Sequence, residues 1–333
     1  MSNQLVAPKL EQILHLKMKI ETKTGLLISA GRAIGRIGGV DVESMSVERE
    51  YLCNDNTRIT ARVPYIPGSS LKGRMRSLLE LSLGLPLYST DKKIWAHTPS
   101  VGAHKTLPTS DESDKDKLNL EEFLQIIDKY KINKLFGYSS FRIEDLEDLI
   151  KKQEPGRQNE SQQSKIDISI VKKLTPTLFL VDDFFVETEY VCNIYQRNGI
   201  VSFDDFVEEK SENRIDRITS MADPRAILRV KPGIKFEGKV SLLIFENIRN
   251  ELKEYLGLLL NGLYLVEATY LGASGSRGYG RVKFVDIQIS STKIVGNTVS
   301  ETGVPVKQMF EDLDDLKNNL ESVIGAIQTS KGT

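Results

Sequence analysis

The chain has very few of the residues that build disulfides and metal sites. Among its 333 residues there are only two cysteines and three histidines. Cys53 and Cys192 stand alone, with no CxxC pair, which favours free thiols in a reducing, cytoplasmic setting. His97 and His104 could share a metal ion, but no second pair of ligands follows at zinc-finger spacing. We therefore predict two surface histidines in a loop and no bound cofactor.

Long apolar runs and a strong net charge are also lacking. No run is long enough to span a membrane, and the first residues, MSNQLVAPKLEQ, contain no hydrophobic signal segment, so we expect no membrane partner. The net charge of -1 excludes a whole-molecule field that attracts nucleic acid. Any nucleic-acid site must therefore come from cations that cluster locally. The length predicts one elaborated domain or two small ones.

The stretch IPGSSLKGRMRSLLELSL, over 66–83, combines a helix start with cations. Ser69 or Ser70 is predicted to cap the helix through its side-chain oxygen. Apolar residues recur at helical spacing, which indicates one buried face: Leu71, Met75, Leu78, Leu79 and Leu83. The cations on the other faces are Lys72, Arg74 and Arg76. Free N–H groups beside cations predict a phosphate site, and the alternative is an ordinary helix with a solvated basic side.

Two glycine-rich stretches add further candidates for phosphate contacts. The segment 25–39, GLLISAGRAIGRIGG, reads as a long loop that carries Arg32 and Arg36. The segment 272–280, GASGSRGYG, offers backbone, polar and aromatic groups: Gly275, Ser276, Arg277, Gly278 and Tyr279. It is neither a P-loop nor a dinucleotide-binding turn, because a strand follows it. A mobile surface loop is the alternative for the first segment.

The stretch ENRIDRITSMADPRAILRVKPG, over 212–233, is locally basic. Five cations and two anions lie between Asn213 and Lys231, an excess of +3. The cations that we predict to bind RNA here are Arg214, Arg217 and Arg225. Proline and glycine favour an extended arm over a helix, and a solvated loop is the alternative. Further upstream, Asp182 and Asp183 suggest acid–base or metal chemistry, but we favour a strand edge or turn.

Periodicity predicts a mixture of strands and helices. The expected strands cover 16–22, 47–52, 58–66, 178–191, 234–245 and 281–289, with 262–269 continuing the sheet. Beyond the central helix, the expected helices cover 118–130, 248–260 and 306–327. The polar segments 86–117 and 139–170 are predicted to be insertions.

Three segments together resemble a known family: IPGSSLKGRMRSLL, ENRIDRIT followed by Pro224 and Arg225, and GASGSRGYGRVKF. They are similar, in the same order, to the backbone subunit of type III-A (Csm) CRISPR effector complexes in the RAMP superfamily. The resemblance implies an α+β, ferredoxin-like (RRM-like) palm with a β-hairpin thumb over 187–231 and a C-terminal helix. It also implies an RNA-binding subunit that stacks along a guide RNA, helps hold a target RNA, and assembles with neighbouring backbone subunits, a large polymerase-like subunit and a small subunit.

One departure from the family pattern concerns catalysis. Active members read GLHIGGGDAFSAIGAID after the first strand, whereas this chain reads GLLISAGRAIGRIGGVD and places Arg32 at the aspartate position. A cation cannot act as a general base or metal ligand, so we expect a non-cleaving subunit. The alternative is a magnesium-dependent endoribonuclease that uses another carboxylate, of which Asp41 is a weak candidate. A third hypothesis is guide processing by His15, which is predicted on a strand with no obvious partner.

Overall fold

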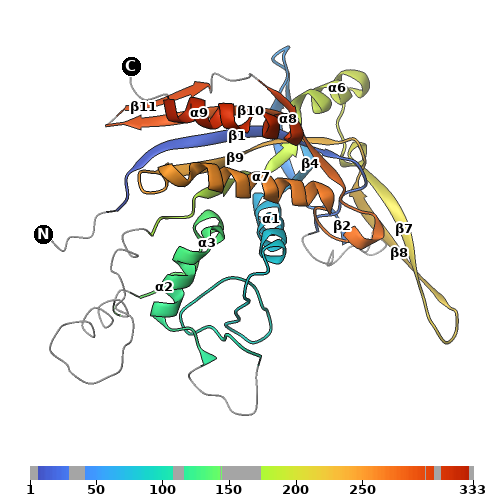
Figure 1. The fold of residues 1–333 in the computed structure, drawn as a ribbon. Coiled ribbons are helices and arrows are strands. Elements are labelled where there is room, and N and C mark those ends of the chain that lie inside the picture. The colour runs from blue at the N-terminus through green and yellow to red at the C-terminus, as the bar shows by residue number, and fades with distance from the viewer. Residues whose placement is uncertain are drawn as a thin grey trace, which may run out of the picture.

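The chain folds around one large antiparallel sheet (Figure 1). The structure is a computed structural model that describes residues 7–29, 42–107, 116–142, 144, 174–296, 298–303 and 309–329. The sheet order is β11-β10-β1-β9-β6-β4-β3, with β12 and β5 paired beside this path. Its strands are β1 (Leu10–Thr22), β3 (Ser46–Leu52), β4 (Arg58–Ile66), β5 (Phe179–Val181), β6 (Phe184–Val186), β9 (Lys235–Phe245), β10 (Val282–Val295), β11 (Thr298–Gly303) and β12 (Phe310–Asp312).

The centre of this sheet has ferredoxin-like topology. Along the chain, β1 is followed by helix α1 (Gly68–Ser82), the short strands β5 and β6, then β9, helix α7 (Leu252–Ala268) and β10. In space the strands run β10-β1-β9-β6, which is the order of a βαββαβ unit in which the first and last strands are neighbours. The predicted α+β fold class is confirmed.

Alternation along β1 positions the core. Leu14, Leu16, Met18 and Ile20 are fully buried, whereas Lys17 and Lys19 between them point to the opposite face. α1 buries Leu71 and Met75 against the sheet and packs along α7. Each such buried apolar side chain contributes about 1.5–3 kcal/mol.

A two-stranded hairpin projects from the palm (Figure 1). It consists of β7 (Val207–Ile215) and β8 (Ala222–Val230), and β2 (Val42–Glu43) joins β8 to complete a small second sheet. Its turn is held by Asp216, whose carboxylate accepts hydrogen bonds from the N–H groups of Ile218 and Thr219. The prediction of an extended arm at this place is confirmed.

Three predicted elements differ from the structure. Residues 262–269 belong to α7, because Leu259, Leu263 and Val266 continue the helical spacing of buried residues. The strand expected over 178–191 ends early, and helix α6 (Thr188–Asn198) begins. The region 306–327 holds β12 and the helices α8 (Leu313–Asn318) and α9 (Leu320–Thr329), because the Asp312 carboxylate caps α8 at its start.

The first predicted insertion builds a small core of its own with the residues after it. Helix α2 (Leu120–Lys129), capped by Asn119, packs its apolar side chains with the described part of 86–117. Helix α3 (Lys131–Phe136) follows and buries Ile132, Leu135 and Phe136 in the main core instead. The buried members of the small core are Tyr88, Ala103, Leu118, Leu120, Phe123, Leu124 and Ile127. Residues 108–115 and most of 139–170 lie outside the described residues, so the predicted insertion boundaries stay predictions.

His97 lies inside this region and is fully buried, so its prediction as a surface histidine is wrong. Its Nδ1 donates to the Pro86 carbonyl at 2.7 Å, and Asn133 Nδ2 lies 3.2 Å from its Nε2. Burial lowers the pKa of His97. The ring therefore serves packing and hydrogen bonding in the neutral form.

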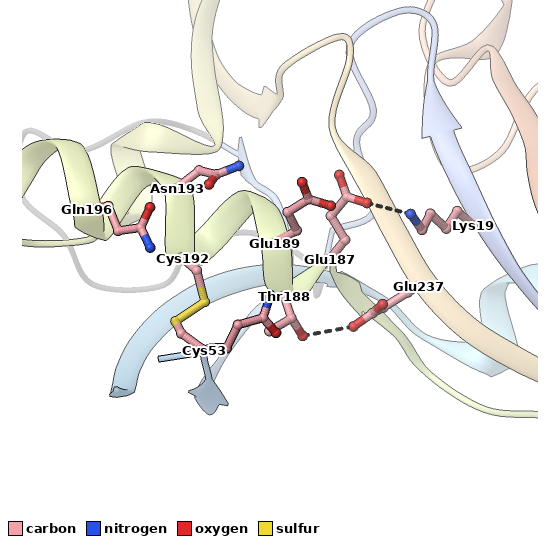
Figure 2. Close-up of a pocket in the computed structure, with 10 residues that line it drawn as sticks. Lys19, Cys53, Glu187, Thr188, Glu189, Cys192, Asn193, Gln196 and Glu237 are labelled. Carbon is pink, nitrogen blue, oxygen red and sulfur yellow. Dashed lines mark hydrogen bonds and ion pairs between the residues drawn. A yellow bond between two sulfur atoms is a disulfide. The ribbon is translucent and has the colours of Figure 1, made fainter. Parts of the chain in front are cut away.

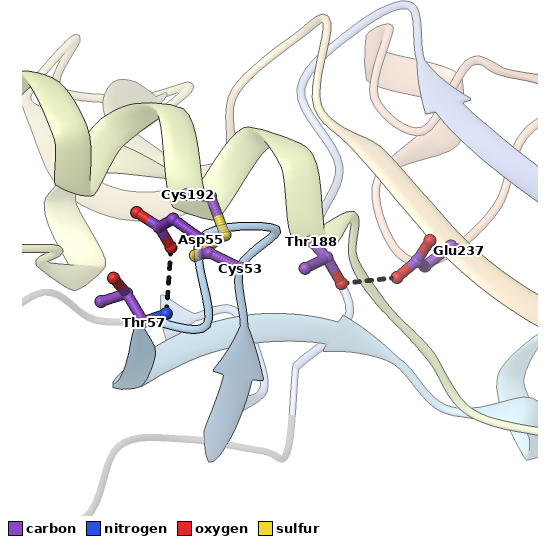
Figure 3. Close-up of a disulfide and its surroundings, with 6 residues drawn as sticks. All are labelled: Cys53, Asp55, Thr57, Thr188, Cys192 and Glu237. Carbon is purple, nitrogen blue, oxygen red and sulfur yellow. Dashed lines mark hydrogen bonds between the residues drawn. A yellow bond between two sulfur atoms is a disulfide. The ribbon is translucent and has the colours of Figure 1, made fainter.

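The two cysteines form a disulfide, so the prediction of free thiols is also wrong (Figure 3). Cys53 follows the end of β3 and Cys192 lies on α6, and their Cα atoms are 5.8 Å apart across 139 positions of sequence. The spacing of the two cysteines offers no sign of this pairing, because only the tertiary fold brings α6 against the turn between β3 and β4. No helix in the described part of the chain is both long and apolar enough to cross a membrane.

Candidate nucleic-acid interface

The N-terminus of α1 is already occupied by a carboxylate. Asp183 Oδ1 accepts a hydrogen bond from the Gly68 N–H at 2.7 Å. The residue before the helix is Pro67, and neither Ser69 nor Ser70 caps it, so that prediction is wrong. Asp182 and Asp183 lie in the turn between β5 and β6, as favoured from the sequence. The carboxylate of Asp183 thus occupies the helix start at which the sequence predicts a phosphate.

Two predicted cations of α1 point into the protein. Lys72 Nζ donates to the Phe179 carbonyl at 2.8 Å, and partial burial lowers its pKa. Arg76 donates to Glu80 and to the carbonyls of Gly137 and His97, at 2.7, 3.0 and 2.8 Å. All three of its guanidinium nitrogens have partners within the protein, which disfavours a phosphate contact for Arg76, and its role toward RNA stays a prediction. Lys72 keeps partial exposure, and its role toward RNA stays a prediction.

Arg74 connects α1 to the glycine-rich turn. Its Nε donates to the Tyr270 carbonyl at 3.0 Å, and its guanidinium lies 3.9 Å from the centre of the Tyr270 ring. A Cβ on Gly275 would lie 2.0 Å from that ring, so glycine is required for the turn to pack there. The exposed side of α1 next to Arg74 carries only small residues, Ser69, Gly73 and Ser77.

The glycine-rich turn also pairs with the start of the first loop. The Gly280 N–H donates to the Gly25 carbonyl at 3.0 Å, and the Ala273 N–H donates to the Leu27 carbonyl at 2.8 Å. Leu26 in turn exchanges backbone hydrogen bonds with Val230 at the base of the hairpin. The three segments that the sequence singled out therefore meet at one place, where α1, the turn and the hairpin adjoin.

Exposed cations lie on the glycine-rich turn at this meeting point and along the hairpin that extends away from it. Arg277 on the turn is 65% exposed, next to the exposed Ser276 and Gly278. On the hairpin, Arg214 is 70% exposed and lies 2.8 Å from Asp223, and Arg217 and Arg225 are exposed as well. Arg225 pairs across the strands with Glu212, whose carboxylate lies 3.5 Å from Arg277. Arg225 therefore shares the hairpin face that is turned toward the glycine-rich turn.

Tyr279 does not belong to the exposed set. Its ring is fully buried, and its hydroxyl donates to Glu212 at 2.7 Å. Burial and this carboxylate raise the pKa of Tyr279 to about 12. The ring of Tyr279, one of the candidate contacts of the glycine-rich turn, is therefore not accessible to a stacking base.

Three predicted positions lie outside the described residues: Arg32, Arg36 and Asp41. The residues on either side of their segment are well defined. Ser29 forms a bridge with Ser44, and the Ser44 N–H donates to the Leu228 carbonyl at 3.1 Å. The segment thus leaves and rejoins the described chain beside the base of the hairpin.

A separate hollow of about 400 Å³ lies between α6 and the face of the large sheet opposite to α1 (Figure 2). Glu187, Glu189 and Glu237 line it, and Lys19 is ion-paired to Glu187 at 3.0 Å. The excess of carboxylates makes it unsuitable for a phosphate backbone. In the parts of the chain that the structure describes, no group of three or more His, Cys, Asp or Glu side chains is arranged to hold a metal ion.

His15 has partners that the sequence did not reveal. Its Nδ1 lies 2.9 Å from Ser241 Oγ and its Nε2 lies 2.8 Å from Thr292 Oγ1, on the strands that flank β1. The expectation that it has no partner is wrong, since antiparallel pairing places both hydroxyl groups beside it.

Sequence reasoning also missed Glu212 and Tyr270, and it missed the contact of Asp183 with the start of α1. For Glu212, the alternation of β7, in which Glu208, Lys210 and Glu212 share one face, was an available signal. The other two act through contacts between segments more than 100 residues apart, which no local pattern reveals.

Comparisons with known proteins agree on one family for this chain. The RAMP superfamily matches residues 19–283. The CRISPR system Cms endoribonuclease Csm3 of Methanothermobacter thermautotrophicus is 30% identical over 303 residues, covering 91% of this chain and 96% of that protein. The protein of the same name from Streptococcus thermophilus is 29% identical, covering 84% and 89%. A crystal structure of Methanopyrus kandleri Csm3 aligns over 95% of this chain and 98% of its own, at 17% identity and a TM-score of 0.48.

Proposed function

Since the chain belongs to the RAMP superfamily and is a relative of Csm3 proteins over most of its length, we propose that it is an RNA-binding backbone subunit of a type III CRISPR interference complex. In this role it grips the guide RNA and helps hold the target RNA. Its neighbours are other RAMP backbone subunits, the large polymerase-like subunit and the small subunit.

The observation that carries the proposal is the meeting of α1, the glycine-rich turn and the hairpin. A subunit that repeats along an RNA needs contacts that do not depend on base sequence, which means contacts to phosphate and sugar. The exposed backbone around Gly278 and the small side chains of α1 leave room for a sugar-phosphate chain. Arg277, Arg225 and Arg214 supply the positive charge that the chain as a whole lacks.

The hairpin tip supplies a second requirement of such a subunit. Single-stranded RNA is bound largely by separating and stacking bases, and an apolar side chain can wedge between neighbouring stacked bases. Ile218 is 92% exposed and Met221 is 70% exposed, both in the turn of the hairpin. An exposed apolar side chain at the end of an arm is suited to this contact.

Cleavage of target RNA is not included in the proposed function. The relatives are named endoribonucleases, but the resemblance of this chain to its family implies that Arg32 stands at the position of the aspartate expected in active members. An arginine stays protonated at neutral pH and cannot accept a proton or bind Mg²⁺. The alternative is a magnesium-dependent endoribonuclease that uses Asp41.

The experiment for RNA binding compares two exposed, ion-paired arginines. Arg214→Ala removes a guanidinium from the proposed interface, and Arg58→Ala removes one that is paired with Glu50 on the β3–β4 hairpin. Arg277→Ala and Arg225→Ala extend the set. We expect each interface variant to weaken binding equally for all RNA sequences and to reduce the salt slope by roughly 0.7 per lost phosphate contact. An unchanged slope in all three, equal to that of Arg58→Ala, would reject the interface.

The experiment for cleavage uses the assembled complex with a matched target RNA and magnesium. We expect the target to remain intact where this subunit contacts it. Cleavage at regular intervals that disappears in the Asp41→Ala variant would establish the alternative.

A further inference from the structure

A buried tyrosine joins the hairpin to the palm. The Tyr279 ring belongs to a small cluster with Leu27, Val42 and Ile227, which come from three other segments. Two cations of the hairpin approach the ring, with Lys210 Nζ 4.5 Å and Arg229 Cζ 4.4 Å from its centre. The Tyr279 hydroxyl donates to Glu212 at 2.7 Å.

The neighbours of Tyr279 are themselves fixed. Arg229 is paired with Glu208 across the hairpin at 2.8 Å, and its side chain lies over Gly25. A Cβ on residue 25 would lie 2.2 Å from Arg229 Nε, so this packing depends on glycine at that position. Both strands of the hairpin are thus attached to the palm through residues that contact the Tyr279 ring.

The outer half of the hairpin lacks this support. Beyond Glu212, the side chains of both strands are exposed, from Asn213 to Ile215 and from Ala222 to Arg225. A two-stranded hairpin alone is only marginally stable, so the direction of the outer half depends on how its base is held.

We propose that Tyr279 and Glu212 form a positioning joint, which fixes the angle of the hairpin relative to the glycine-rich turn and thereby selects the nucleotide step that the hairpin tip separates. This inference rests on the proposed RNA-binding function. It adds the residues that determine at which position along the RNA the hairpin separates the bases.

The dimensions make the angle important. The tip lies about 15 Å beyond Glu212, from about 3.3 Å per strand residue plus the turn. A swing of about 13° at the joint then moves the tip by about 3.4 Å, which is the spacing of successive bases along one strand. A small loss of angular restraint at Tyr279 is therefore enough to mix neighbouring registers.

The first test measures the hairpin angle without RNA. Spin labels at Ala222→Cys near the tip and Lys17→Cys on β1 report the distance between hairpin and palm, and the native cysteines remain in their disulfide. Tyr279→Phe removes only the hydroxyl, and Glu212→Gln removes only the charge. Tyr264→Phe is the matched control, because the Tyr264 hydroxyl also donates to a carboxylate, that of Asp314, at 2.7 Å.

We expect the distance distribution to broaden in Tyr279→Phe and Glu212→Gln by about one base spacing, and to stay unchanged in Tyr264→Phe. Unfolding midpoints of the three variants check that each is folded. Distributions for Tyr279→Phe and Glu212→Gln as narrow as that of the parent would overturn the joint.

The second test reads the register on RNA. 2-Aminopurine is placed at successive positions of a bound RNA, and its fluorescence rises where the base is unstacked. We expect one position to dominate with the parent chain and neighbouring positions to rise in Tyr279→Phe, with little change in affinity, because the phosphate contacts are kept. An unchanged register in Tyr279→Phe would reject its role in positioning. Absence of RNA binding by the parent chain would reject the proposed function instead, and the distance measurement would still test the joint.

Discussion

The guanidinium of Arg76 on α1 donates a hydrogen bond to the backbone carbonyl of His97 at 2.8 Å, within the first insertion. The same side chain reaches the Gly137 carbonyl and the Glu80 carboxylate. One arginine therefore holds the palm helix, the insertion and the end of α3 together. Its side chain is 18% exposed and that of Glu80 is 9% exposed, so water cannot replace these bonds at little cost.

We expect Arg76→Ala to lower the free energy of unfolding by about 3 kcal/mol, because it leaves Glu80 and two carbonyls without their partner. Urea unfolding measures this loss. Ser77→Ala, at the exposed neighbouring position, should leave the midpoint unchanged. If Arg76→Ala kept full stability and lost RNA affinity, the phosphate role that the sequence suggested would be supported.

A second prediction concerns the acid sensitivity of His97. Its Nδ1 donates to the Pro86 carbonyl, so in the neutral ring Nε2 accepts from Asn133 Nδ2. Protonation would put a second N–H against that amide donor, and burial already lowers the pKa of His97. A histidine whose pKa is lower in the folded than in the unfolded state makes its full contribution to folding stability above the unfolded-state pKa of about 6.5. This contribution is lost as the pH falls from there toward the folded-state pKa.

The measurement compares the parent chain with His97→Gln in urea at several pH values between about 7.5 and 5.5. We expect the parent to lose stability with acidification more steeply than the variant, by up to about 1.4 kcal/mol for each pH unit below the normal pKa. Parallel pH curves for the two proteins would show that folding does not lower the pKa of His97.

The disulfide leads to a third prediction. It closes a loop of 139 positions that contains both insertions and α1. On the chain-entropy model, a loop of this length gives a stabilisation of about 5 kcal/mol, which reduction would remove. A thermal scan with and without dithiothreitol should therefore show a large drop in the unfolding temperature. The double variant Cys53→Ser with Cys192→Ser should have the unfolding temperature of the reduced protein, with or without dithiothreitol. Equal unfolding temperatures of the oxidised and reduced parent would contradict the pairing.

The elements that could be predicted from the sequence are those with strong local patterns. The alternation of β1, the helical spacing from Leu71 to Leu79 and the turn-rich arm around Asp216 all appear where expected. These features depend on residues within a few positions of one another, so a single sequence contains their signal.

The contacts that the sequence does not reveal are those of side chains whose partners are remote in sequence. Arg76 has the same spacing on the helix whether it faces water or a carbonyl of the insertion, and periodicity cannot distinguish the two. From the sequence, Tyr279 is expected to be an exposed side chain on a glycine-rich loop. It is buried because the hairpin, more than 60 residues before it in the chain, packs against it. Cys53 and Cys192 likewise become neighbours only through the packing of α6.

The last prediction separates contact at the hairpin tip from stability. Ile218 is 92% exposed, so Ile218→Ser should change the free energy of unfolding by less than about 0.5 kcal/mol. The same variant should reduce the fluorescence of 2-aminopurine in bound RNA, because a serine side chain cannot fill the gap between separated bases. Val299→Ser, which alters an apolar side chain with 66% exposure on β11, is the control and should leave the fluorescence unchanged. If Ile218→Ser and Val299→Ser gave the same signal as the parent, base separation would have to come from another residue of the arm, with Met221 as the next one to test.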